Sequence, residues 1–162
     1  MDAVPVKRLT QELFNHLAEQ AQQTPRLRQN HNFHELPEKV QRFLNVLQPG
    51  TYVRPHHHHR QAGVNGFEFF IVLQGAIGIL IFDDQKNVIQ TERLTAGGQM
   101  CGLELAEGTF HTIVALAPNT VMFELKEGPY VPATDKDFLA GFPLEATADA
   151  QAWVKKWELY FA

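Results

Sequence analysis

Apolar residues recur at helical spacing near the start of the chain, between Leu9 and about Gln22. Thr10 stands where an N-cap residue is expected, and Pro25 follows the last apolar position of the stripe. The pattern predicts an N-terminal amphipathic helix. The polar run from Arg26 to His34 has too little apolar periodicity for a helix, so we expect an extended arm there.

Between Arg42 and Glu127 the pattern changes to short runs rich in Val, Ile, Phe and Leu, separated by turn residues such as Pro49-Gly50 and Gly97-Gly98. The strands that we expect are Phe43–Gln48, Tyr52–His58, Phe67–Leu73, Ala76–Phe82, Val88–Leu94, Met100–Leu105, Thr109–Leu116 and Thr120–Lys126. Several short strands at this spacing, with no alternation of strands and helices, predict an antiparallel sandwich or barrel.

Helical spacing returns after Tyr130. Thr134 and Asp137 have the spacing of a capping box, which indicates a short helix over Thr134–Leu139. A second helix is expected after Thr147, which can cap it. The apolar stripe of this helix consists of Trp153, Val154, Trp157 and Phe161. Such a stripe is typical of a helix that packs on the rest of the protein.

Size and composition indicate one globular domain. The chain has 162 residues, 44% of them hydrophobic and 20% charged, which is ordinary for a single folded unit. Within it we expect a helix and arm at residues 1–36, a β-barrel at 37–130 and a helical extension at 131–162.

Charge and cysteine content narrow the possible partners and location. The net charge is −4 and no basic block is present, so a nucleic-acid partner is not expected. The single cysteine, Cys101, excludes an internal disulfide and suits a reducing compartment, and we expect it to be buried. No apolar stretch has the length of a signal peptide or a bilayer span. We therefore expect a cytoplasmic protein with no membrane partner.

Four adjacent histidines, His56 to His59, are the most unusual feature of the sequence. Side chains alternate between the two faces of a strand, so His56 and His58 point one way and His57 and His59 the other. Two imidazoles at this spacing can reach one metal ion. We expect His56 and His58 to be metal ligands, and His57 and His59 to face solvent or a loop.

Glu68 lies in the strongly apolar segment Phe67–Leu73, where an unpaired interior carboxylate would cost several kcal/mol. A divalent ion beside imidazoles would be a suitable partner for it. His111 presents the same problem in a distant strand. We expect His56, His58, Glu68 and His111 to converge on one divalent metal ion inside the barrel.

The spacing of these residues resembles the first motif of the cupin superfamily. That motif runs Gly, five residues, His-x-His, a short gap, Glu, six residues and Gly. Here Gly50 stands five residues before His56, and six residues separate Glu68 from Gly75. The gap between His58 and Glu68 is longer than usual, which implies an extended hairpin loop.

The second cupin motif is matched less fully. Gly108 and His111 have the family spacing, but Ala106 and Ala115 stand where the family often has Pro and Asn. The resemblance implies a mainly β fold, the double-stranded β-helix or jelly-roll barrel, with an N-terminal helix and C-terminal helices added. It also implies a homodimer.

A narrower resemblance is to the WbuC family of cupin-fold metalloproteins, which are encoded in some bacterial surface-polysaccharide clusters. The matching segments are Arg42-Phe43-Leu44-Asn45, Tyr52–His56, the arm Arg28–His34 and Gly128-Pro129-Tyr130. The resemblance spans about Pro25 to Phe142. It implies the fold, the metal and a role in polysaccharide biosynthesis, and it leaves the reaction open.

Several polar residues are candidates for substrate binding. Strand alternation places Tyr52 and Arg54 on the same face as His56, where Arg54 can hold a carboxylate or phosphate or else form a salt bridge at the rim. In an extended arm, Arg28, Asn30, Asn32 and His34 share one face. That face either closes over the barrel mouth or bonds to the barrel edge, and we favour the second. Tyr130 is added on family resemblance alone.

Four protein ligands leave open positions on a five- or six-coordinate ion, where a substrate can bind. We therefore expect an enzyme acting on a small polar metabolite, such as a sugar or sugar nucleotide, by isomerisation, epimerisation or oxygenation. The alternative is a non-catalytic, metal-dependent module that binds a small molecule. Iron, manganese, nickel, zinc and copper all accept three imidazoles and a carboxylate, so the sequence does not distinguish the metal, and no catalytic residue is assigned.

Overall fold

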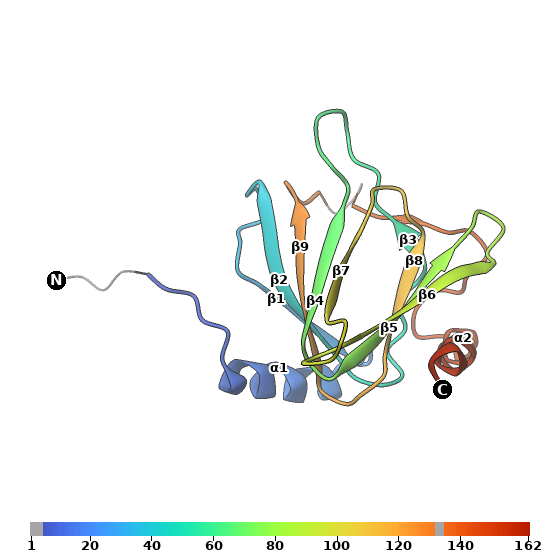
Figure 1. Cartoon of the computed structure of the whole chain (residues 1–162), viewed down its shortest axis with the longest axis horizontal. Helices are drawn as coiled ribbons and strands as arrows, with labels where there is room; N and C mark the ends of the chain where they lie inside the picture. The colour runs from blue at the N-terminus through green and yellow to red at the C-terminus, as the bar shows by residue number, and fades with distance from the viewer. Residues whose placement is uncertain (1–4, 132–134) are drawn as a thin grey trace.

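The computed structural model describes residues 5–131 and 135–162. Two five-stranded antiparallel sheets face each other, one in the order β1-β2-β9-β4-β7 and the other in the order β10-β3-β8-β5-β6 (Figure 1). The strands are β1 (Arg28–Asn32), β2 (Val40–Leu47), β3 (His56–His57), β4 (Glu68–Gln74), β5 (Ala76–Phe82), β6 (Val88–Thr95), β7 (Gly102–Leu105), β8 (His111–Ala115), β9 (Thr120–Glu127) and β10 (Asp137–Phe138). The helices are α1 (Gln11–Gln23), α2 (Ala148–Glu158) and the 3-10 turn η1 (Leu159–Phe161). The predicted mainly β fold with terminal helices is confirmed.

The main core lies between the two sheets. Alternate residues of β5, Ile77 and Ile79, are fully buried against Phe70 and Met122 of the facing sheet. The other face of β5 is buried as well, because Leu80 and Phe82 join an apolar cluster with residues of α2. Two further apolar clusters extend the core, one joining α1 to β2 and the other joining α2 to the second sheet.

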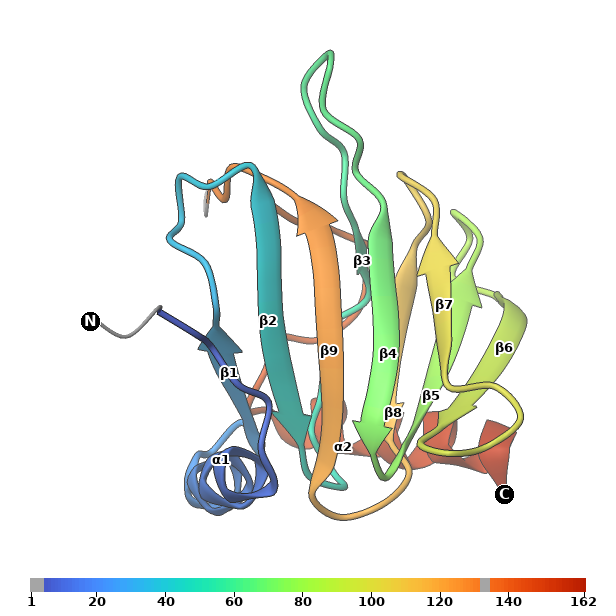
Figure 2. The ribbon, with the colours of Figure 1, turned by 60° about the vertical axis from the view of Figure 1, so that its left-hand side comes forward.

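The terminal helices begin at the predicted caps. The hydroxyl of Thr10 accepts a hydrogen bond from the Leu13 amide, and that of Thr147 accepts one from the Ala150 amide, each at 3.2 Å. In Figure 2, α1 lies below the β1 edge of one sheet and α2 packs beside the other sheet. Among residues 5–131 and 135–162, no helix combines the length and the hydrophobicity that a membrane crossing needs.

The extended arm is a true strand. β1 pairs with β2 in antiparallel register, with Asn30 opposite Asn45. The backbone of the arm therefore bonds to the barrel edge, as we favoured from the sequence. The long gap between His58 and Glu68 forms a loop that rises above the sheets between β3 and β4 (Figure 1).

Three local predictions are wrong. The strand expected over Tyr52–His58 is reduced to β3, His56–His57, because Pro55 cannot donate to a ladder. The sequence predicts a helix over Thr134–Leu139, but Asp137 and Phe138 form β10 and pair with β3. Tertiary pairing here overrides the local helix signal. Thr134 lies outside the described residues. Cys101 is exposed, not buried, because it precedes the edge strand β7.

Candidate metal centre

The fold brings the four predicted ligands together between the sheets. β3 carries His56 and is followed directly by His58, and His56 lies opposite His111, the first residue of β8. Glu68 begins β4 in the facing sheet. All four side chains are buried, with at most 4% of each residue exposed. Antiparallel pairing thus joins two imidazoles, and sheet-on-sheet packing adds the carboxylate.

The ligand atoms of His56, His58 and Glu68 lie within reach of a single ion, and His111 contacts the same carboxylate. One nitrogen of His56, one of His58 and one oxygen of Glu68 lie within 4.8 Å of one another. The Nε2 atom of His58 lies 3.0 Å from Glu68 Oε1, and that of His111 lies 3.1 Å from Glu68 Oε2. The imidazoles of His56 and His111 are 4.7 Å apart between ring centres.

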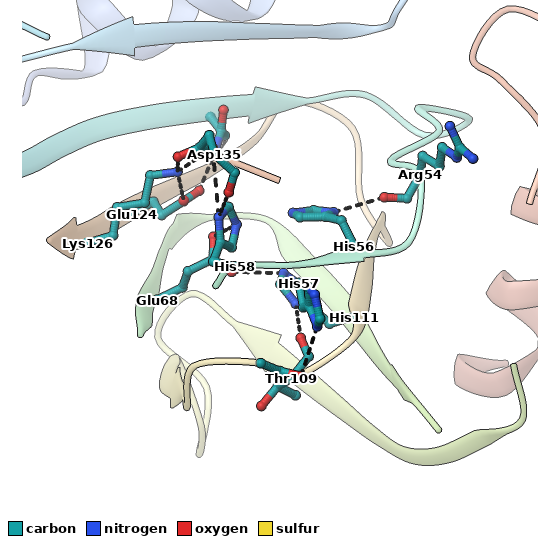
Figure 3. Close-up of polar contacts among 12 residues, drawn as sticks. Arg54, His56, His57, His58, Glu68, Thr109, His111, Glu124, Lys126 and Asp135 are labelled. Carbon is teal, nitrogen blue, oxygen red and sulfur yellow. Dashed lines mark hydrogen bonds and ion pairs between the residues drawn. The ribbon is translucent and has the colours of Figure 1, made fainter. Parts of the chain in front are cut away.

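Each of the three imidazoles has its Nδ1 atom beside a backbone carbonyl (Figure 3). His56 bonds to Arg54 O at 2.9 Å, His111 to Thr109 O at 2.9 Å, and His58 to Asp135 O. A carbonyl oxygen only accepts, so Nδ1 carries the hydrogen, and Nε2 is the nitrogen that can bind an ion. This is the tautomer and orientation that metal-binding histidines commonly show.

The donor set fits a divalent cation. With Nδ1–H donating, the Nε2 atoms of His58 and His111 face the oxygens of Glu68, and a divalent cation held between them would satisfy all of these atoms. His58 Nε2 is also buried without a hydrogen-bond partner among the described residues. Burial would raise the pKa of Glu68, but the neighbouring His111 and His58 hold it well below its usual range. Burial depresses the pKa of His56, which favours the neutral ligand form.

Sequence reasoning missed a buried charged network beside the ligands. Glu124 and Lys126 lie on the inward face of β9, and Lys126 Nζ is 3.2 Å from Asp135 Oδ2 and 3.7 Å from Glu124 Oε1. Asp135 also accepts from Arg60 at 2.9 Å. Burial, and then the charge of Glu68, raises the pKa of Glu124 to about 8. The argument that singled out Glu68, a charge in an apolar strand, applies equally to Glu124 and Lys126.

Two cavities adjoin the ligands. An inner one of about 70 Å³ is lined by His56, Glu68 and His111 together with apolar residues of both sheets. An outer one of about 280 Å³ lies above it. Five predicted substrate-binding residues line the outer cavity: Arg28, Asn30, Asn32, His34 and Tyr130. Their placement is compatible with the predicted role.

Tyr52 and Arg54 are placed differently from the prediction. Tyr52 stacks on Trp157 at 5.6 Å between ring centres, and its hydroxyl donates to Pro143 O. Arg54 lies over the Phe138 ring, and Figure 3 shows its side chain extending away from the imidazoles. Val53, not Arg54, lines the inner cavity. Val53 and His56 therefore both face inward, although strict alternation would place them on opposite faces. The alternation used for the prediction fails because this segment is not a regular strand.

His57 and His59 point away from the four ligands, as alternation predicts. The His57 ring stacks on Phe110 at 4.0 Å, and its Nε2 atom lies 3.5 Å from Asp137. His59 is exposed. The histidine block is therefore divided into two residues that join the buried cluster and two that do not.

Comparison with known proteins gives one family match. The model of a family described as a domain of unknown function (DUF6016) matches residues 9–94. This span contains His56, His58 and Glu68 and ends before His111. No curated protein matches the chain significantly.

Several solved structures share the fold. The capsular polysaccharide assembling protein CapF from Staphylococcus aureus is 21% identical over 68% of this chain and 31% of its own, with a TM-score of 0.56. KdgF from a Halomonas species is 21% identical over 65% of this chain and 82% of its own, with a TM-score of 0.50. Oxalate decarboxylase from Bacillus subtilis is 16% identical over 69% of this chain and 27% of its own, with a TM-score of 0.50. The chain thus spans about a third of the length of CapF, and the predicted cupin fold is confirmed.

Proposed function

The chain belongs to the family described as a domain of unknown function (DUF6016), and from its geometry we propose that it is a metal-dependent cupin enzyme. One divalent ion would be held by His56, His58, Glu68 and His111. The observation that carries the proposal is the orientation of the three imidazoles. Each donates from Nδ1 to a carbonyl and directs Nε2 into the same buried space beside Glu68.

The ion would supply Lewis acidity toward an oxygen of a bound metabolite. The chain's own residues would do the rest. Phe70, Ile113 and Met122 line the inner cavity and keep bulk water from it. Glu124 lines both cavities, and burial raises the pKa of its carboxyl group, so it is placed to give or take a proton there.

The substrate in this proposal is a small polar metabolite such as a sugar or sugar nucleotide, and the reaction is an isomerisation, epimerisation or oxygenation. The outer cavity supports this class of substrate, because the predicted substrate-binding residues that line it carry amide, imidazole, guanidinium and phenol groups. The WbuC resemblance and the description of CapF as a capsular polysaccharide assembling protein support a role in surface-polysaccharide biosynthesis. A cytoplasmic homodimer is part of the same proposal.

Element analysis of the purified protein is the first test. We expect about one equivalent of a transition metal per chain, and its identity decides between the reactions, because zinc would disfavour oxygenation. His58→Ala should lose the metal. His59→Ala is the matched control, since it removes an imidazole from the same block that does not join the cluster. Equal metal content in both variants would contradict the proposed site.

Turnover is the second test. Candidate sugars and sugar nucleotides should give product with the wild-type protein and none with His58→Ala. Ligand binding without product, across several metals, would contradict an enzyme and favour a binding module.

A further inference from the structure

The outer cavity adjoins the inner cavity at the predicted metal ligands. Arg28, Asn45, Glu124 and Lys136 line both the outer and the inner cavity, so the two meet at these residues. Lys136 was not singled out by the sequence analysis, because it lies in a polar segment between β9 and β10. These four side chains therefore lie between a ligand in the outer cavity and the predicted metal ligands.

Lys136 differs from the other cations around the cavities. Lys126 is paired with Asp135 and Glu124, and Arg26 and Arg28 share Glu145. Within residues 5–131 and 135–162, Lys136 has no hydrogen bond or ion pair of its own. Burial, opposed by Glu124, lowers the pKa of its ammonium. A cation kept in a cavity without a fixed counter-ion is suited to receive the acid group of a ligand.

Asparagine side chains form another part of the lining of the outer cavity. Asn30 and Asn32 alternate along β1, and Asn45 lies opposite Asn30 in β2. Asn45 Nδ2 donates to Glu124 at 2.8 Å, whereas Asn32 makes no side-chain hydrogen bond among the described residues. A carboxamide both donates and accepts, as a sugar hydroxyl does. The volume of about 280 Å³ is near the lower end of small-molecule sites, which run from about 300 to 1,000 Å³, and suits a single sugar ring.

We propose that the outer cavity binds an anionic monosaccharide, with its carboxylate or phosphate on Lys136 and its hydroxyl groups on the asparagines of β1 and β2. This inference rests on the proposed function and narrows its substrate class. It adds Lys136 as the residue that selects for charge. A neutral sugar would form no ion pair with the Lys136 ammonium, and binding would be weaker for that reason.

Isothermal titration calorimetry with three probes tests the proposal: galacturonate, galactose 1-phosphate and neutral galactose. We expect at least one of the two anions to bind about tenfold or more tightly than galactose, the size of one charge-assisted hydrogen bond. Lys136→Met should remove this preference, and Lys136→Arg should retain it. Lys155→Met, on the exposed face of α2, is the matched control and should bind like the wild type.

Equal affinity for all three sugars, or an unchanged preference in Lys136→Met, would overturn the inference, and so would no binding of any probe. Circular dichroism establishes that the variants fold. Titrations repeated after chelation separate this inference from the proposed function, because the charge preference belongs to Lys136 and not to the ion. Anion selectivity in a protein that never binds metal would support the inference and contradict the metalloenzyme.

Discussion

At the scale of single residues, Asp135 connects the predicted ligand His58 to the segment that precedes β10. Its backbone carbonyl accepts from His58 Nδ1, and its carboxylate bonds to Arg60 and Lys126. One residue thus orients a ligand through its main chain and neutralises two cations through its side chain. Groups that orient a metal-binding imidazole commonly change metal affinity by 10–100-fold when they are removed.

We predict that Asp135→Asn lowers stability, and that it also lowers metal affinity, because the ion pairs of this side chain hold in place the backbone carbonyl that bonds to His58. The amide keeps an acceptor for Arg60 but removes the carboxylate that lies 3.2 Å from Lys126 Nζ. Breaking a buried ion pair costs about 3–5 kcal/mol, and the retained acceptor makes this an upper bound. Urea unfolding and competition with a chelator measure the two effects.

The control for this change is Asp84→Asn, in the exposed turn between β5 and β6. It should alter stability by no more than about 0.5 kcal/mol, as surface substitutions do. If Asp135→Asn behaved like this control, the network would have no part in holding His58.

At the scale of elements, the β4–β5 turn shows why a glycine stands at one motif position. Gly75 has a φ of +73°, which side-chain-bearing residues rarely adopt. A Cβ atom there would lie 2.4 Å from Thr120 Oγ1 and 3.0 Å from Thr120 Cα. Backbone conformation and close approach to β9 both require the glycine.

We predict that Gly75→Ala destabilises the protein more than Gly97→Ala does. Gly97 also has a positive φ, +65°, but a Cβ atom there would meet nothing within 4 Å. Both changes carry the backbone cost, and only Gly75→Ala adds the crowding, which is typically about 1–3 kcal/mol. The difference between the two unfolding free energies isolates the crowding, and equal values would refute it.

For the molecule as a whole, the C-terminal helix closes an aromatic cluster on the outside of the second sheet. Trp157 is 1% exposed and lies against Tyr52, Phe82 and Phe142. This packing explains why Tyr52 is directed away from the metal centre. The aromatic cluster that holds α2 and the two cavities beside the predicted ligands thus lie in different parts of the protein.

We predict that Trp157→Ala costs about 3–5 kcal/mol, as large-to-small changes in a core do. Trp157→Phe should cost clearly less, because the indole Nε1 has no hydrogen-bond partner among the described residues. Metal content per folded chain should be unchanged in both variants. A similar loss in the two variants would show that the indole nitrogen contributes to stability after all.

Most of the secondary structure, and the identity of the four expected ligands, followed from local patterns in the sequence. Period-two and helical spacings located most strands and both capped helices, because burial on one face imposes those periods. The four expected ligands could be named because polar groups in apolar strands need a partner. Their convergence, however, depends on the pairing of β3 with β8 and on the packing of one sheet over the other.

By itself, the sequence determined which side chains are chemically able to hold a metal and which segments form strands. Only the tertiary structure decided that Asp135 and Lys136, distant along the chain from the histidines, lie beside them, and that Arg54 turns away. The physical reason is that alternation specifies a face only within a regular strand, and it is lost where Pro55 interrupts the segment before His56. Contacts between the two sheets depend on packing, which no local pattern encodes.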